Sequence, residues 1–163
     1  MARSAMHVRE TDLMAAFFSF LHFVGAFALV VALTVELISI REELDIRNSF
    51  RILAADLVYG MSAGVVLVAG LLRVVYFEKG ASYYFASIPF LLKASLFLLV
   101  AAASIYPTFE FLSWYKPLRQ GRMPLLTDRK RQVIRSIIHW EFAGIFAIVL
   151  CAALMAKGVG RFG

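Results

Sequence analysis

The feature that most constrains this chain is a set of four long apolar segments separated by short charged, glycine- or proline-containing breaks. These segments cover residues of about 13–40, 50–77, 87–115 and 132–156. Each exceeds the ~20 apolar residues that a helix needs to cross a bilayer. They are too long and too evenly apolar for barrel strands, so their backbone hydrogen bonds must be formed within helices. We expect an all-α integral membrane protein, with residues 1–163 forming a single transmembrane four-helix bundle.

Composition and charge agree with a lipid-facing protein. Hydrophobic residues make up 61% of the chain, more than the ~45–50% of an average soluble domain. The formal net charge is +6, but the basic residues flank the apolar segments. That placement is typical of orientation charge in a membrane, and it argues against a nucleic-acid partner. The single cysteine, Cys151, excludes an internal disulfide and is expected to pack as a small apolar side chain.

The basic residues are distributed unequally between the two sides. Ten lie beside the first and third connections, against six near the termini and the second connection, with Lys93 inside a segment. The larger set is Arg41, Arg47, Arg51, Lys116, Arg119, Arg122, Arg129, Lys130, Arg131 and Arg135. Because Lys and Arg accumulate on the cytoplasmic side, we expect both termini on the periplasmic side of a bacterial inner membrane.

Three basic residues form a first level of polar groups inside the apolar segments. His22 and Lys93 are expected roughly 10–15 Å below the same end of their helices, at ~1.5 Å per residue. Two such groups at one depth require that one be neutral or that an anion lie between them. Arg73 lies nearer the surface, where snorkelling explains it as well as function does. We therefore predict that His22, Lys93 and Arg73 are candidate ligand-binding residues, for a ligand that carries carboxylates.

A second level of polar groups lies toward the expected cytoplasmic side. Ionisable groups at membrane depth are costly, and each is a functional hypothesis by default. The alternative is a lattice of ion pairs that ties the helix ends together, with Arg51 as a further partner. The residues of this level are Glu36, Asp56, Glu110, Arg135, His139 and Glu141.

Two features bear on whether a flat cofactor could bind. Gly60 and Gly64 form a small-xxx-small pair, which predicts close approach of another helix or room for a planar group. His22 and His139 are the candidate axial ligands of a haem. Measured from the same end of the bundle, His139 is expected at a depth of ~25 Å and His22 at ~10–15 Å. This difference in depth argues against one haem that both histidines hold. No other metal site is indicated.

Several strings resemble a known family. "DLVYG", "FEKG" and "SIYPT", within longer matching stretches, resemble the DUF2214 family of predicted bacterial membrane proteins. The resemblance covers the chain except the N-terminal dozen residues and the loop of residues 116–130. It implies a membrane protein and carries no activity.

A more distant resemblance suggests a function. The layout is similar to that of the HemJ-type protoporphyrinogen oxidases, small helical membrane proteins with a His in the first helix and a Lys in the third. His22 and Lys93 stand at the corresponding places. The resemblance implies a membrane oxidoreductase or other redox role with haem b or another tetrapyrrole.

Two other functions stay open at this stage. The chain could be an accessory or assembly subunit of a larger membrane complex, with membrane-protein partners or a second copy as a homodimer. It could also be a small transporter or proton pathway, because ionisable groups lie at two depths.

Overall fold

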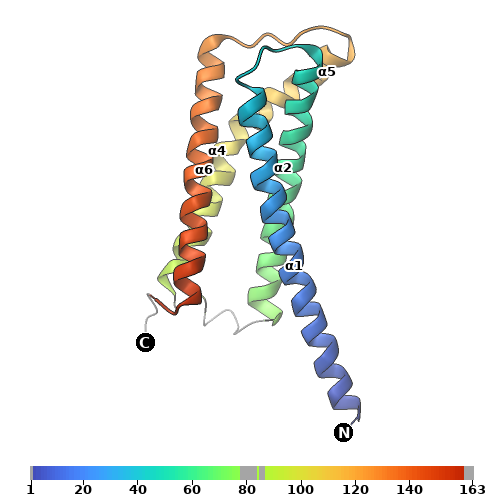
Figure 1. The fold of residues 1–163 in the computed structure, drawn as a ribbon, viewed down its shortest axis with the longest axis vertical. Coiled ribbons are helices and arrows are strands. Elements are labelled where there is room, and N and C mark those ends of the chain that lie inside the picture. The colour runs from blue at the N-terminus through green and yellow to red at the C-terminus, as the bar shows by residue number, and fades with distance from the viewer. Residues whose placement is uncertain (1, 78–83, 85–86, 160–163) are drawn as a thin grey trace.

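The computed structural model describes residues 2–77, 84 and 87–159, which are largely helical (Figure 1). Four long helices dominate: α1 (Ala2–Ser39), α2 (Ile46–Leu72), α4 (Ile88–Ser113) and α6 (Asp128–Ala156). A π-helical turn, η1 (Arg73–Phe77), continues α2, and a short helix, α5 (Tyr115–Arg119), follows α4. Four helical stretches are long and apolar enough to cross a membrane. The predicted all-α, four-helix membrane bundle is therefore confirmed.

The four helices run alternately up and down. α1 begins and α6 ends at the same end of the bundle, as predicted (Figure 1). We call this end the terminal end. The opposite end carries the α1–α2 connection and the segment from α5 to α6, and we call it the loop end.

α2 and α6 begin earlier than the apolar segments that they contain, because a capping side chain, not hydropathy, sets the start of each. Asp45 caps α2 by accepting a hydrogen bond from the Asn48 N–H. Thr127 caps α6 by accepting one from the Lys130 N–H. Each side chain satisfies a backbone donor that has no partner within the helix, so charged residues fill the first turns. α1 likewise extends through its polar start to Ala2.

The bundle consists of two helical hairpins. α1 packs chiefly on α2, and α4 packs chiefly on α6. The hairpins share one buried apolar cluster, which lies in the half of the bundle nearer the loop end. Its members are Leu29, Ala32, Leu33, Ile40, Ile52, Tyr59, Phe111, Trp114, Leu118, Ile134 and Ile138.

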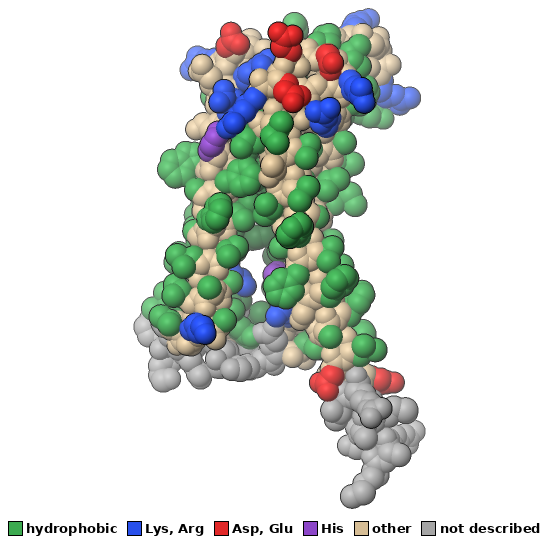
Figure 2. All heavy atoms as spheres, in the orientation of Figure 1, with side chains coloured by type: hydrophobic (Ala, Val, Ile, Leu, Met, Phe, Trp, Pro, Cys, Tyr) green, Lys and Arg blue, Asp and Glu red, His purple; other side chains and the backbone are tan. Residues whose placement is uncertain are grey.

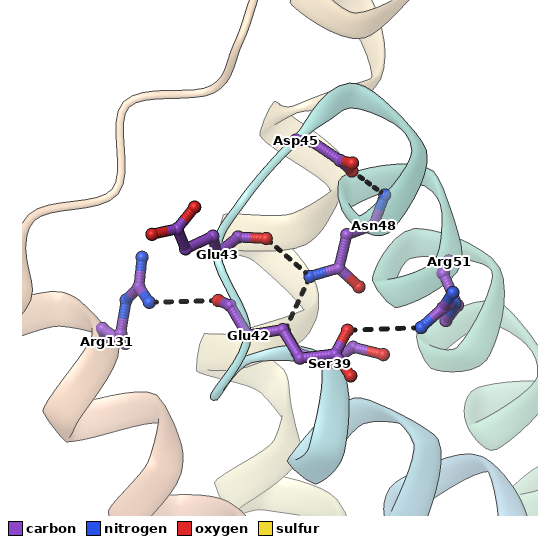
Figure 3. Close-up of polar contacts among 7 residues, drawn as sticks. All are labelled: Ser39, Glu42, Glu43, Asp45, Asn48, Arg51 and Arg131. Atoms are coloured by element: carbon purple, nitrogen blue, oxygen red, sulfur yellow. Dashed lines mark hydrogen bonds and ion pairs between the residues drawn. The ribbon is translucent and has the colours of Figure 1, made fainter.

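Polar contacts fix the loop end (Figure 3). The Asn48 side chain donates hydrogen bonds to the backbone carbonyls of Ser39 and Glu43, at 2.9 and 3.1 Å. Arg131 of α6 donates to the carbonyl of Glu42, and Arg51 pairs with the Glu42 carboxylate at 3.4 Å. The α1–α2 connection is thereby attached to both hairpins.

The half nearer the terminal end is different. The buried cluster does not extend into it, and the hairpins diverge there (Figure 1). Figure 2 shows an opening between them, with apolar side chains around it and histidine and basic side chains at its edge. The bundle is thus closed at one end and split at the other.

The glycine prediction for α2 is not supported within this chain. In the described structure, nothing lies within 4 Å of a Cβ built on Gly60 or Gly64, and both residues are exposed. The close approach instead occurs at Gly25 of α1, against Val65 and Val66 of α2, and at Gly144 of α6. A Cβ on Gly144 would lie 2.4 Å from Cγ2 of Val100, so α4 and α6 can meet only because the side chain is absent.

Candidate functional site

Three carboxyl groups lie together inside the loop half of the bundle. Glu36 comes from α1, Asp56 from α2 and Glu141 from α6. Their exposed fractions are 2%, 5% and 2%, which is rare for acidic residues. Asp56 and Glu141 both lie within electrostatic range of Glu36, and Asp56 within that of Glu141. We call this group the carboxyl cluster.

The helical repeat of the buried positions places the carboxyl side chains in the interior. The buried face of α2 includes Ile52, Ala55, Asp56, Tyr59 and Ser62, each of which has another member of the set three or four positions away. Asp56 and Tyr59 are therefore turned inward together with the apolar residues of the same stripe. On α6, Glu141 follows the buried Ile134 and Ile138 at the same spacing. Packing against the apolar core takes these polar side chains into the interior.

Hydrogen bonds in the cluster are incomplete. The Thr108 hydroxyl of α4 donates to Asp56 Oδ1 at 2.7 Å. The Tyr59 hydroxyl interacts with the side chain of Ser104, also on α4. In the described structure, Oε1 of Glu36 and Oε1 of Glu141 are buried and have no hydrogen-bond partner. All four long helices thus contribute polar atoms, yet two carboxyl oxygens stay unsatisfied.

The basic residues proposed as partners for these carboxyls bind elsewhere. Arg51 pairs with Glu42 at the loop end. Arg41 approaches Nε2 of His139 at 3.3 Å, and Nδ1 of His139 contacts the Arg135 carbonyl one turn back. The charged groups that act on Glu36 are the other two carboxyls. An ion-pair lattice therefore does not account for the carboxyl cluster.

The other predicted residues of this level lie nearer the surface. Lys130 binds both carboxylate oxygens of Glu110, at 2.9 and 3.0 Å. The His139 side chain is exposed, and Arg135 is half-buried on the same helix. The ion-pair interpretation holds for Glu110, which is paired at the rim of the bundle, apart from the carboxyl cluster.

The basic residues of the first level are divided between the hairpins. His22 of α1 is half-buried, and its Nδ1 lies 3.0 Å from the Val66 carbonyl of α2. Since a carbonyl can only accept, Nδ1 carries the proton in this contact, and the lone pair of the neutral ring is on Nε2. The ring packs on Gly70, where a Cβ would lie 3.2 Å from its Cε1.

Lys93 and Arg73 lie on different hairpins, both near the terminal end. Lys93 is the sixth residue of α4, half-buried, with its Nζ 5.9 Å from the centre of the Phe90 ring. Arg73 begins η1, three residues after the glycine that His22 contacts. At ~1.5 Å per residue, Lys93 lies ~8 Å from Ile88, where α4 begins, and Gly70 and Val66, which His22 contacts, lie ~10–17 Å from Phe77. The match in depth stays a prediction, and the described contacts of His22 are made within its own hairpin.

Sequence reasoning missed part of the carboxyl cluster. Tyr59 and Thr108 were not singled out, although Tyr59 is one turn from Asp56 and fully shares its buried face. Thr108 directly follows Pro107 within α4. A polar residue three positions from a buried acid was the available signal for Tyr59. For Thr108 no signal was available, because only the packing of α4 shows that it faces α2.

The described part of the chain contains no group of three or more His, Cys, Asp or Glu side chains placed to hold a metal ion. The carboxyl cluster thus collects acids without a metal-binding geometry.

Comparison with known proteins shows the family. Residues 14–160 match the model of the family described as "Predicted membrane protein (DUF2214)", and the chain belongs to this family. No curated protein and no solved structure matches the chain.

Proposed function

We propose that this member of the DUF2214 family binds haem b or a related tetrapyrrole between its two hairpins and has a redox role in the membrane. The observation that carries the proposal is the opening in the terminal half, which has histidine and basic side chains at its edge (Figure 2). A planar ligand suits a gap between diverging helices. In a closed four-helix bundle, that space would be filled by side chains.

The geometry of His22 fits an axial ligand. Ligating histidines usually donate the N–H of one ring nitrogen to a carbonyl or carboxylate, which fixes the tautomer and the ring orientation. The contact from Nδ1 to the Val66 carbonyl has this form. Gly70 lets the ring lie close to α2. His22 would hold the iron through Nε2.

Lys93 and Arg73 supply charge for the ligand's carboxylates. Charge-assisted hydrogen bonds from such cations are about twice as strong as neutral ones. The two residues come from different hairpins, so one ligand could bridge them. When bound, the haem would supply one-electron chemistry, while the chain orients the ring and neutralises its propionates.

His139 does not fit a second axial position. Its side chain is exposed, it contacts Arg41 and the Arg135 carbonyl, and it belongs to the loop half. A haem in the opening would therefore have His22 as its histidine ligand.

Spectroscopic titration tests this proposal. Haem b is added to protein purified in mild detergent, and the Soret band is followed. The wild type and a His139→Ala variant should give a saturable band, and His22→Ala should shift or lose it. Lys93→Ala should weaken binding by about 10- to 100-fold, with the band position unchanged, because one charge-assisted contact contributes ~1.5–3 kcal/mol. Equal binding by the wild type and His22→Ala would refute axial ligation by His22.

Two other roles remain as outcomes of tests on the same preparation. Stoichiometric membrane proteins that co-purify, without any bound tetrapyrrole, would favour an accessory or assembly subunit. Ion flux in proteoliposomes that is lost in Asp56→Asn would favour a transporter or proton pathway. If the chain forms a homodimer, the same purification would yield a complex of two copies.

We also propose that the protein lies in a bacterial inner membrane, with the loop end on the cytoplasmic side. The ten basic residues near the loop end, against six near the terminal end, support this orientation. Cysteine accessibility at Gln120 and at Lys157 would test it: a membrane-impermeant thiol reagent on intact cells should label the second position and not the first.

A further inference from the structure

We propose that Glu36 and Glu141 form a proton-binding site inside the membrane, where one of the two carboxyl groups holds a proton. The site is distinct from the opening near His22 and rests on neither the haem role nor a transport role. Both side chains are 2% exposed, and each has a buried Oε1 without a hydrogen-bond partner. Two buried oxygens without a hydrogen-bond partner indicate that a ligand binds here.

Among the described residues, only carboxyl groups act as charges on Glu36 and Glu141, and this decides what the site can bind. A carboxylate buried without a partner is strongly unfavourable, and a second carboxylate within electrostatic range adds repulsion. Arg41 and Arg51, the basic residues nearest in sequence to Glu36 and Asp56, make their contacts at the loop end. Arg135 and His139 precede Glu141 on α6, but neither is among the charged groups that act on Glu141. A proton on one carboxyl removes one of the two buried charges and the repulsion between them. One bound proton therefore makes the burial of both side chains less unfavourable.

The surrounding groups from every helix are polar but not cationic. α2 contributes Asp56 and Tyr59, and α4 contributes Thr108 and Ser104. Thr108 donates to Asp56, which leaves Asp56 better satisfied than the two glutamates. The proton is thus assigned to the pair from α1 and α6, with Asp56 as the neighbouring charge.

An apolar path leads to this site from the side of the bundle. A pocket of about 350 Å³ lies between α4 and α6, and Glu141 is its acidic lining residue. The rest of the lining is apolar or glycine, including Leu99, Val100 and Gly144. A hydrophobic reagent dissolved in the bilayer can therefore approach Glu141 without crossing the charged loop end.

Dicyclohexylcarbodiimide is the appropriate probe. It is hydrophobic and adds to a protonated carboxyl group to give an O-acylisourea, which rearranges to a stable N-acylurea where water is excluded. The whole reagent is retained and nothing leaves, so the protein gains the mass of one carbodiimide. The chain is reconstituted in phosphatidylcholine vesicles, labelled at neutral pH and mapped by mass spectrometry of its peptides.

The wild type should carry one label, on Glu36 or Glu141. Glu36→Gln and Glu141→Gln should each reduce labelling, and the double variant should abolish it. Glu110→Gln is the matched control, because Glu110 is paired with Lys130 at the rim and should not be the labelled group. Labelling should fall as the pH rises, since only the protonated acid reacts.

Three outcomes would overturn the proposal. These are an unlabelled wild type, a label that persists in the double variant, and protection by Na⁺ at constant pH, which would indicate an alkali-cation site instead. If the double variant does not fold, infrared spectroscopy of the wild type decides. A carbonyl band of a protonated carboxyl, shifted in D₂O, supports the site, and its absence at neutral pH refutes it.

Discussion

The loop half and the terminal half of this bundle are built from similar apolar helices, yet they pack differently. In the loop half, Phe111, Ile134 and Ile138 are fully buried, and both hairpins contribute to one core. In the terminal half, Phe20 and Leu98 are 65% and 63% exposed, and the hairpins diverge. Since lipid is as apolar as leucine, hydrophobicity does not force the hairpins together. Packing and polar contacts decide where the bundle closes.

The largest expected effect concerns the core of the loop half. Phe111→Ala should lower the free energy of unfolding in detergent by about 3–5 kcal/mol, because it leaves a cavity among fully buried side chains. Phe20→Ala is the matched change in the terminal half, where the ring is exposed, and should stay within about 0.5 kcal/mol. Equal losses in an SDS-unfolding titration would contradict the contrast between the halves.

A smaller effect is expected where α4 meets α6. Gly144→Ala should cost about 1–3 kcal/mol, because its methyl group would meet Cγ2 of Val100 and push the helices apart. Gly60→Ala should be neutral or stabilising by up to about 1 kcal/mol, since nothing in the described structure lies near its Cβ position. Thermal unfolding of both variants tests this. A destabilised Gly60→Ala would reveal a partner at that face.

The smallest effect should come from the hydrogen bond between α4 and α2. Thr108→Val removes the donor to Asp56 and should cost about 1 kcal/mol. A double-mutant cycle with Asp56→Asn should give a coupling energy of about 0.6–1.7 kcal/mol, the range measured for hydrogen bonds between membrane helices. A coupling of zero would mean that the contact does not join the hairpins.

The predictions for the second polar level show what a sequence can and cannot provide. The acids and bases at this level were recognised because charge is rare in apolar segments. Which residues pair with which could not be predicted from the sequence. Glu110 pairs with Lys130 at the rim, while Glu36 and Glu141 lie within electrostatic range of each other. Partners on different helices depend on rotation and tilt, and these are set by packing. Tyr59 and Thr108 were missed for the same reason.

The sequence by itself determined that the chain is helical, that it crosses the membrane four times and that the start of the first helix lies on the same side as the end of the last. These follow from segment length, and from the need to satisfy the backbone in hydrocarbon. Only the tertiary structure decided that the hairpins close at the loop end and part at the other, and that three acids meet between them. Apolar helices in lipid have no preferred partner until side-chain shape, glycine positions and hydrogen bonds select one.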